Sequence, residues 1–287
     1  MIVVTGATGN LGSRIVRELL ERMPATEVGV SVRDTAKAAE LASLGVRVRR
    51  GDFTDPGSLA HAFESATQVL VVSSDASGDA AVAQHRTAID AAVAAGAERV
   101  VYTSHQASAA ESLFAPMPDH AATTDHLTTL GRPFTALRNG FSASTVPFLI
   151  GPALKSGMIV APADGPVSWT TDADLAAADA AILAEPGRFE GETPALTAPE
   201  THDLEDIARI LSELSGREIR RVVAPDDEWL RGLTKYGVPP EQAQVLLGMF
   251  LATRRGEFAV TDPTLEELIG RPAQSIRSVL EGLAARG

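Results

Sequence analysis

The chain opens with Met1-Ile2-Val3-Val4-Thr5-Gly6-Ala7-Thr8-Gly9-Asn10-Leu11-Gly12, and this stretch decides its fold. Residues 2–4 form a β-branched run, which predicts a short strand buried on both faces of a sheet. The run ends before Gly6, and beyond it apolar residues recur at helical spacing, at positions 11, 15, 16, 19 and 20. A strand, a tight glycine turn and a helix in this order are typical of the start of a dinucleotide-binding unit.

Each glycine of this turn has a separate role in such a unit. Gly6 permits the tight turn, Gly9 lets the backbone approach a pyrophosphate, and Gly12 lets helix and strand pack closely. The phosphates are expected over free N–H groups at the helix N-terminus, where the dipole favours negative charge. The spacing is Gly-x-x-Gly-x-x-Gly rather than the Gly-x-Gly-x-x-Gly of the dehydrogenase fingerprint, so the alternative is a merely structural turn. The candidate cofactor-binding residues here are Gly6, Thr8, Gly9, Asn10, Leu11 and Gly12.

The composition excludes several classes of function. The 25 basic and 37 acidic residues give a net charge of −12, which opposes any broad nucleic-acid-binding surface. The chain has no cysteine, so disulfides, thiolate catalysis and cysteine-ligated zinc are ruled out. It starts directly with a strand and has no apolar run of membrane-spanning length, so we expect a cytoplasmic protein without a membrane anchor. The six histidines are not spaced to predict a metal site.

Strand and helix patterns alternate through the first half of the chain, which predicts an α/β Rossmann fold with a doubly wound parallel sheet. The expected strands are residues 28–32, 46–48, 69–72, 100–104 and 134–137, with helices over 35–44, 55–63, an alanine-rich segment ending at 96, and 119–130. After residue 141 this alternation fails. Later strands are expected over 194–197 and 220–223, and helices over 172–183, 202–215, 240–254 and 273–285. We therefore predict a Rossmann domain over 1–140, completed by 168–198, and a smaller substrate-binding region over 141–287.

Arg33 decides the choice of cofactor, because it ends the predicted second strand beside the expected adenosine ribose. A carboxylate there would bind the 2′-hydroxyl of NAD, whereas a guanidinium suits a 2′-phosphate by charge and forked geometry. Lys37 can add a second positive charge near the same phosphate. Asp34 argues the other way, since it can accept from a ribose hydroxyl, although it can equally cap the following helix. The pattern favours NADP(H) over NAD(H); the alternative is that Arg33 and Lys37 are solvated surface charges.

Four hydroxyl residues stand at the ends of two predicted strands. Ser73 and Ser74 follow the fourth strand, and Thr103 and Ser104 end the fifth. Open α/β sheets bind ligands at the carboxyl ends of their strands. We therefore expect the first pair to face the cofactor and the second pair to lie near the nicotinamide ribose. The alternative is that each residue is an ordinary strand terminus.

Several motifs together are specific to one family. Besides the glycine turn, the chain carries Val-Arg-Asp-Thr-Ala-Lys-Ala at 32–38, Gly-Asp-Phe at 51–53, Gln-His-Arg at 84–86, Tyr-Thr-Ser at 102–104, Leu-Arg-Asn-Gly-Phe at 137–141 and Leu-Ile-Gly-Arg at 268–271. With these motifs it resembles the NmrA-like branch of the atypical short-chain dehydrogenases over nearly its whole length. Within that branch it looks most similar to the group of NADPH-dependent quinone oxidoreductases and triphenylmethane reductases.

The resemblance implies roles for four further residues. Asp52 and Phe53 follow the third strand, and the resemblance places them beside the adenine. It also places Asn139 and Phe141 in the cleft, where Asn139 hydrogen-bonds the cofactor or substrate and Phe141 walls the nicotinamide. For this second pair the alternative is an ordinary turn with Asn139-Gly140 at its tip.

The catalytic pair of short-chain dehydrogenases is absent from this sequence. These enzymes carry Tyr-x-x-x-Lys on the helix after the fifth strand, and the tyrosine gives a proton to the substrate oxygen. Here the corresponding helix has Ala122 four residues before His126, so both the tyrosine and the lysine are missing. His126 is one candidate to stabilise developing charge or hold the ribose, and His105, directly after the fifth strand, is a second candidate acid. The alternative is that His126 is a surface histidine with neither role.

The sequence therefore predicts an NADPH-dependent oxidoreductase that transfers hydride directly to a quinone-like or other conjugated, electron-poor small molecule. Such acceptors take hydride into a conjugated system, so their reduction needs little help from a proton donor. The alternative belongs to another class: a non-catalytic NADP(H)-binding redox sensor of NmrA type, which would tolerate loss of the Tyr/Lys pair. A biosynthetic reductase with a specialised substrate is a third interpretation. The sequence leaves the physiological substrate and the oligomeric state open.

Overall fold

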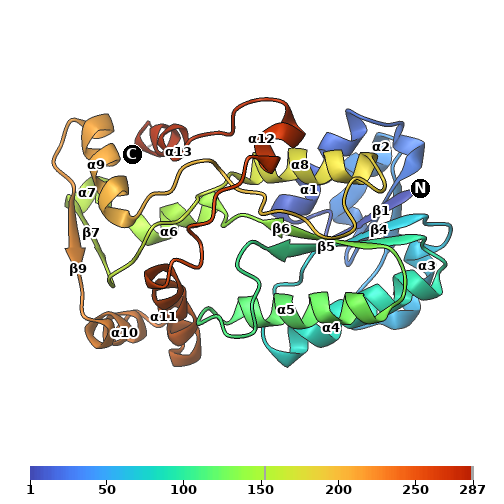
Figure 1. Cartoon of the computed structure of the whole chain (residues 1–287), viewed down its shortest axis with the longest axis horizontal. Coiled ribbons are helices and arrows are strands. Elements are labelled where there is room, and N and C mark those ends of the chain that lie inside the picture. Colours follow the sequence, from blue (N-terminus) through green and yellow to red (C-terminus); the bar gives the residue numbers. More distant parts are fainter. Residues whose placement is uncertain (152, 286–287) are drawn as a thin grey trace.

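The computed structural model describes residues 1–151 and 153–285, and a seven-stranded parallel sheet lies at its centre (Figure 1). The strand order is β3-β2-β1-β4-β5-β6-β8, and each neighbouring pair is parallel. The order reverses next to β1, as in doubly wound dinucleotide-binding folds, so the predicted α/β fold is confirmed. The strands are β1 (Ile2–Thr5), β2 (Val28–Val32), β3 (Arg47–Arg50), β4 (Gln68–Val71), β5 (Arg99–His105), β6 (Phe134–Asn139) and β8 (Gly191–Glu192).

Helices cover both faces of this sheet. Val3 and Val4 are both fully buried, and they point to opposite faces because successive side chains of a strand alternate. Val4 belongs to the core under α1 (Asn10–Leu20) and α8 (Asp172–Ala184). Val3 belongs to the core under α3 (Pro56–Phe63), α4 (Asp79–Ala94) and α5 (Pro116–Thr129). Burial on both faces explains why the strands are continuous apolar runs in the sequence.

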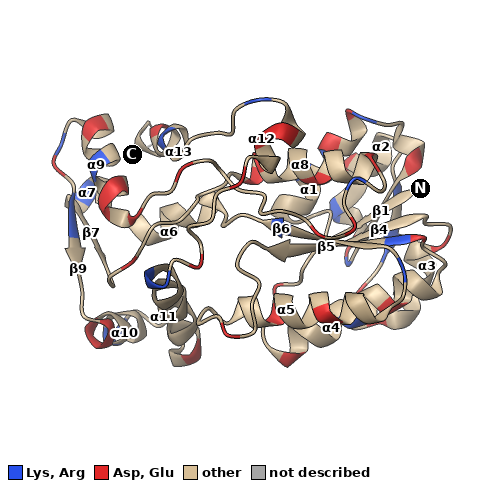
Figure 2. Cartoon of the chain, viewed as in Figure 1, with Lys and Arg blue, Asp and Glu red and all other residues tan. Residues whose placement is uncertain are grey.

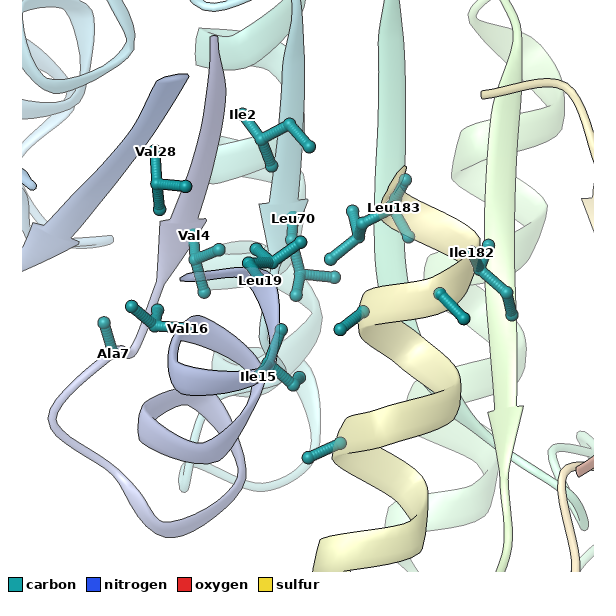
Figure 3. Packing of buried hydrophobic residues seen from close by; sticks show 14 of the residues in the cluster. Ile2, Val4, Ala7, Ile15, Val16, Leu19, Val28, Leu70, Ile182 and Leu183 are labelled. Atoms are coloured by element: carbon teal, nitrogen blue, oxygen red, sulfur yellow. The ribbon is translucent and has the colours of Figure 1, made fainter. Parts of the chain in front are cut away.

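Helix α1 shows how the sequence sets this packing. Its apolar residues recur at helical spacing, so Ile15, Val16 and Leu19 lie on one buried stripe. Figure 3 shows Leu19 beside Leu70 of β4 and Ile15 on the side of α1 that faces α8. Each aliphatic side chain buried in this way stabilises the fold by about 1.5–3 kcal/mol.

The predicted helix over 35–44 is split in the structure. Residues Thr35–Ala38 form a 3-10 turn, and α2 follows as Ala39–Ser43. The side chain of Asp34 caps the 3-10 turn by accepting the Ala36 N–H at 3.0 Å. Two further 3-10 turns are Ala25–Glu27 and Ala143–Thr145, and α12 (Thr264–Ile269) packs on α8.

A second apolar core lies beyond the carboxyl ends of the strands, in the left half of Figure 1. Aromatic side chains dominate its centre, among them Trp169, Phe250 and Phe258. A separate two-stranded parallel ribbon of β7 and β9 borders it. The elements here are α6 (Val146–Ile150), α7 (Ala153–Ser156), β7 (Met158–Ala161), α9 (Leu204–Ser215), β9 (Arg220–Val223), α10 (Asp226–Lys235), α11 (Pro240–Arg254) and α13 (Ile276–Ala284).

The strand predicted over 194–197 is displaced in the structure. Strand β8 is Gly191–Glu192, and the predicted segment continues beside β6 through single contacts. Leu196 donates its N–H to the Arg138 carbonyl, and Gly140 donates its N–H to the Leu196 carbonyl, both at 2.9 Å. Pro194 has no N–H to donate, which interrupts regular pairing. The domain division at residue 140 stays a prediction, and residues 152, 286 and 287 of its second region lie outside the described residues.

Acidic and basic residues are interspersed over both halves of the molecule (Figure 2). Acidic residues are visible on α4, α5, α9 and α12, and basic residues on β9 and α11. In residues 1–151 and 153–285, the helices are too short or too polar to span a membrane.

Candidate functional site

A cavity of about 630 Å³ opens at the carboxyl ends of β1, β2, β3 and β4. It lies beside the point where the strand order reverses, which is the ligand site of doubly wound folds. The cavity brings together predicted cofactor-binding residues from four segments of the chain: Gly6, Thr8, Gly9, Asn10, Leu11, Gly12, Arg33, Lys37, Asp52, Phe53, Ser73 and Ser74. A smaller cavity of about 250 Å³, beside Met1, Gln68 and Arg99, contains none of the predicted site residues.

The glycine turn has the geometry that an anion site requires. Gly6 has a φ of 60°, and its carbonyl accepts the Gly9 N–H at 2.9 Å, which closes the turn. A Cβ at position 12 would lie 2.4 Å from the Gly6 carbonyl oxygen, so no side chain fits there unless the backbone moves. No described side chain caps the N-terminus of α1, which begins after Gly9. The N–H groups of its first turn are therefore available to a phosphate.

Two cations stand where the sequence predicts the 2′-phosphate. Arg33 directly follows β2, Lys37 lies in the next 3-10 turn, and both are exposed side chains on the cavity lining. Asp34 is engaged in capping that turn, which corresponds to the capping alternative. The charge at this end of the cavity therefore suits a phosphate better than an uncharged ribose hydroxyl.

Asp52 and Phe53 line the cavity after β3, and their place beside the adenine stays a prediction. The Oδ1 of Asp52 accepts the N–H of Thr54 at 2.9 Å and its hydroxyl at 2.8 Å. These hydrogen bonds, followed by the charges of Arg50 and Arg33, lower the pKa of Asp52. The carboxylate is therefore ionised at neutral pH and is held within its own loop.

The four hydroxyl residues at the strand ends separate into two layers. Ser73 and Ser74 line the cavity, whereas Thr103 and Ser104 lie behind it and are 3% and 4% exposed. Thr103 Oγ1 accepts the N–H of Ser73 at 2.8 Å, so it supports the cavity wall. The buried hydroxyls of Ser31 and Ser74, both lining residues, have no hydrogen-bond partner in the part of the chain that the structure describes.

NADP(H) fits this lining on three independent observations. The first turn of α1 packs so closely on Gly6 that no side chain fits at position 12, and no described side chain caps its N–H groups. Arg33 and Lys37 supply positive charge after β2, and the buried hydroxyls of the lining residues Ser31 and Ser74 have no partner among the described residues. Pyrophosphate, 2′-phosphate and ribose each meet a group of suitable chemistry.

Asn139 and Phe141 lie in the interior and not on the cavity lining. Asn139 is 5% exposed, and its Nδ2 donates to Asp179 Oδ2 on α8 at 2.9 Å. Burial raises the pKa of Asp179 to about 7, although that hydrogen bond acts in the opposite direction. Phe141 contacts Phe258 and Trp169, with ring centroids 4.7 Å and 5.4 Å away. These rings form an apolar wall beyond the end of β6.

The structure does not bring His126 together with the cofactor-binding residues. It lies in the last turn of α5, and its Nε2 is 2.8 Å from the Oδ1 of Asp90 on α4. A helix that follows a parallel strand runs back toward the start of that strand, so this turn lies away from the carboxyl edge. His126 therefore connects α5 to α4 at a point away from the cavity.

A chain of hydrogen bonds that the sequence reasoning missed connects the cavity wall with α5. The Nε2 of His85 on α4 accepts the Ser74 N–H at 2.9 Å. The Nδ1 of His85 is 3.0 Å from Thr123 Oγ1 and 3.3 Å from the Tyr102 hydroxyl. That hydroxyl lies 2.8 Å from the Nδ1 of His120 on α5. Gln84-His85-Arg86 and Tyr102-Thr103-Ser104 were visible as motifs, but nothing in the sequence indicated that they meet His120.

His105 lies at the end of β5, next to this chain. Its ring stacks with that of His120 at a centroid distance of 6.2 Å, and Phe141 and Phe258 contact it edge-on at 5.5 Å and 5.6 Å. Burial lowers the pKa of His105 to about 3, with further contributions from the charges of His120 and Arg138. At neutral pH the ring is uncharged, so it donates a hydrogen bond but is not a strong acid. Within the described residues, no group of three or more His, Asp or Glu side chains can hold a metal ion.

Known proteins resemble this chain over nearly its whole length. The model of the NmrA-like family matches residues 1–281. Quinone oxidoreductase 2 of Escherichia coli (strain K12) is 32% identical over 277 residues, which cover 96% of each chain. The structure of an E. coli NADPH-dependent quinone oxidoreductase complexed with NADPH has a TM-score of 0.92 at 30% identity, over 99% of each chain. The Citrobacter sp. triphenylmethane reductase complexed with NADP(H) has a TM-score of 0.89 at 33% identity, over 99% of this chain and 100% of that one.

Proposed function

The chain belongs to the NmrA-like family, and we propose that it reduces a quinone-like or other conjugated, electron-poor acceptor by direct hydride transfer. It is an NAD(P)H-dependent oxidoreductase with a preference for NADP(H), in line with the cofactors bound to its E. coli and Citrobacter relatives. The class of acceptor is the finer part of this proposal, and the residues at the carboxyl edge of the sheet support it.

The cavity residues bind and orient the cofactor. The first turn of α1 holds the pyrophosphate through backbone N–H groups, and Arg33 with Lys37 holds the 2′-phosphate. Ser73 and Ser74 support the middle of the dinucleotide from the end of β4. When bound, the reduced nicotinamide supplies hydride, and the protein supplies orientation and electrostatics.

The observation that carries the acceptor class is the lack of a strong acid on the elements that bear catalytic groups in short-chain dehydrogenases. Ala122 stands where the tyrosine is expected, and His126 contacts Asp90 on α4 instead of the cavity. Tyr102 is fully buried in the core, and burial raises the pKa of its hydroxyl. Conjugated acceptors delocalise the electrons they receive, so they react without a proton donor in the rate-determining step.

The aromatic side chains near His105 suit a flat acceptor. Phe141 contacts Phe114 and Phe258 as well as His105, with ring centroids 4.7 to 6.0 Å apart. Planar conjugated molecules stack favourably on such rings at distances of about 4.5–7 Å. Phe141 and Phe258 are buried, so the interior next to His105 is apolar.

The test is NADPH oxidation, followed by loss of its absorbance, with para-benzoquinone and a cationic triphenylmethane dye as acceptors. The chain has no cysteine, so quinones have no thiol to alkylate during the assay. We expect steady turnover with both acceptors and faster turnover with NADPH than with NADH. Tight NADPH binding without turnover of either acceptor would instead favour the redox-sensor alternative.

A further inference from the structure

We assign the protons of the hydrogen-bond chain from Ser74 to His120 starting from the backbone N–H of Ser74, whose direction is fixed. Ser74 donates its N–H to His85 Nε2, so the neutral His85 ring carries its proton on Nδ1. That Nδ1–H points to the Thr123 and Tyr102 hydroxyl oxygens, at 3.0 Å and 3.3 Å. Tyr102 is then free to donate its O–H to the Nδ1 of His120 at 2.8 Å. In this assignment the proton of a neutral His120 sits on Nε2.

The Nε2–H of His120 is left as a donor. Within residues 1–151 and 153–285, no protein group forms a hydrogen bond with it. His105 is fixed in the same tautomer, because its Nδ1 accepts the Ala107 N–H at 3.2 Å. The two rings are inclined by only 29°, so two neutral N–H donors stand together at the carboxyl end of β5.

The position of His120 ties it to the cofactor cavity. His85 holds the backbone of Ser74, which lines the cavity, and Gln84 on the same helix turn lines it as well. Asp119, next to His120, accepts the Gly78 N–H at 2.7 Å, so the loop after β4 is fastened to the start of α5. His120 therefore stands between the cavity wall and the aromatic wall around Phe141.

We propose that His120 is a catalytic residue whose neutral Nε2–H donates a hydrogen bond to the oxygen of a quinone acceptor, with Tyr102 and His85 as positioning residues. This inference rests on the proposed function. A quinone that gains a hydride, one proton and two electrons, from the reduced cofactor becomes a hydroquinone monoanion, and the cofactor leaves as NADP⁺. His120 stabilises the new negative charge on oxygen and keeps its own proton. The monoanion then takes a proton from water.

The electrostatic surroundings keep this donor neutral. The titratable and charged groups around it are His85 on α4, Tyr102 and His105 on β5, Asp119 on α5 and Arg138 on β6. Burial lowers the pKa of His120 to about 4, and the neighbouring imidazole of His85 acts in the same direction. A neutral donor differs from an imidazolium acid in one measurable way: kcat for a quinone should not change between about pH 6 and about pH 9. A rate that falls with a pKa near that of free histidine would overturn the proposal.

The decisive experiment compares two acceptors with one variant, His120→Ala. With para-benzoquinone, which becomes an oxyanion, kcat should fall by about a hundredfold, as for loss of one oxyanion-stabilising donor. With crystal violet, a cation that becomes neutral on gaining hydride, kcat should stay within about threefold, because no oxyanion forms. His120→Gln keeps a neutral N–H donor and should recover at least about tenfold of the lost quinone rate. His61→Ala, an exposed histidine on α3, is the matched control and should leave both rates unchanged.

A second measurement needs no turnover. The visible absorption of para-nitrophenolate, a stand-in for the hydroquinone monoanion, shifts when its oxygen accepts a hydrogen bond. Titration of the NADP⁺ complex should give this shift with wild type and His120→Gln, and should lose it with His120→Ala. Tyr102→Phe should lower quinone kcat several-fold and leave the KM for NADPH unchanged. The change removes the hydroxyl that fixes the tautomer of His120, but it does not alter the lining of the cofactor cavity.

The outcomes of these experiments distinguish a failure of the role of His120 from a failure of the proposed reductase activity. Equal losses for quinone and dye in folded His120→Ala, checked by circular dichroism, would overturn the role of His120 and leave the reductase standing. An unchanged quinone rate in that variant would do the same. No turnover of either acceptor by wild type would overturn the proposed function, and this inference would fall with it.

Discussion

Asn139 on β6 and Asp179 on α8 meet in the interior, where the Nδ2 of Asn139 donates a 2.9 Å hydrogen bond to the Oδ2 of Asp179. Asp179 is fully buried, and the other oxygen of each side chain has no partner among the described residues. One hydrogen bond does not compensate a carboxylate for the loss of its hydration. Burial accordingly raises the pKa of Asp179 from an ordinary 3.8 to about 7.

This contact predicts a pH dependence of stability. The folded state holds the Asp179 proton more tightly than the unfolded state, so the free energy of unfolding decreases as pH rises from about 4 to about 7. Asp179→Asn removes the titration and keeps an acceptor for Asn139. Relative to wild type, its free energy of unfolding should rise across this window by up to about 4 kcal/mol, at about 1.4 kcal/mol per pKa unit.

Denaturant unfolding at about pH 5 and about pH 8 checks this expectation. Asp125→Asn, an exposed carboxylate on α5, is the matched control and should change stability by less than about 0.5 kcal/mol at either pH. If Asp179→Asn had the same effect at both pH values, the buried carboxyl would not titrate in this range.

Arg33→Ala should distinguish the two cofactors. Loss of a charge-assisted contact with the 2′-phosphate costs about 1.5–3 kcal/mol, so NADPH affinity should fall by roughly tenfold to a hundredfold. NADH affinity should change little, because that cofactor has no 2′-phosphate. Lys37→Ala should act in the same direction but less, since an exposed ammonium is well screened.

Calorimetric titration of both cofactors provides the measurement for Arg33. Arg17→Ala is the matched control, because Arg17 is equally exposed on α1 but pairs with Glu40 outside the cavity lining. If Arg33→Ala lowered the affinities for NADPH and NADH equally, Arg33 would not bind the 2′-phosphate.

The sequence predicts features whose residues are contiguous or lie at strand ends. The stretch from Gly6 to Gly12 is contained in one local pattern, and in the structure it forms the turn after β1 and the start of α1. Arg33 and Ser73 each follow a buried apolar run, so their place at the carboxyl edge follows from the parallel order of the strands. The parallel strand order therefore brings residues that are far apart in the sequence to one cavity.

No local sequence pattern predicts the contacts between polar residues that are distant in the chain. Asp179 occurs in an alanine-rich helix, and only the packing of α8 against the sheet brings it to Asn139. The chain from His85 through Tyr102 to His120 joins three elements, each of which has an ordinary amphipathic or buried pattern. Periodicity indicates which face is buried, but it does not indicate which polar side chains meet there.

Gly9→Val should abolish binding of both nicotinamide cofactors. A Cβ at this position would already lie 3.2 Å from the Gly6 carbonyl oxygen, and the methyl groups beyond it would occupy the space of the pyrophosphate. Fluorescence titration with NADPH and NADH measures the loss, and circular dichroism confirms that the variant is folded. Gly232→Ala on α10, where a Cβ meets open space, should bind both cofactors as wild type does. A folded Gly9→Val protein with normal affinity would refute this placement of the phosphates.

His126→Ala should leave catalysis nearly intact. The imidazole contacts Asp90 on α4 at 2.8 Å and lies outside the cavity lining. We expect kcat for a quinone within about threefold of wild type, and a loss of stability of about 1 kcal/mol or less, typical of a partly exposed polar contact. Asp90→Ala should reproduce that small loss. A fall in kcat of about a hundredfold or more, with a changed acidic limb of the pH profile, would instead identify His126 as a general acid.

Simple aldehydes should be poor substrates of this protein. Hydride addition to an unactivated aldehyde leaves an alkoxide that is far more basic than a hydroquinone monoanion, so its formation needs a proton donor. A general acid typically contributes about 10²–10⁴-fold. At the carboxyl end of β5, burial keeps His105 and His120 neutral and encloses Tyr102, so none of these three described side chains is a strong acid. NADPH oxidation with butanal should therefore be slower than with para-benzoquinone by at least that factor, beyond the difference measured for the two acceptors with a nicotinamide in solution. Fast reduction of butanal by the wild-type protein would contradict both the acceptor class and the neutral state of these imidazoles, because it would require a strong acid at the carboxyl edge of the sheet.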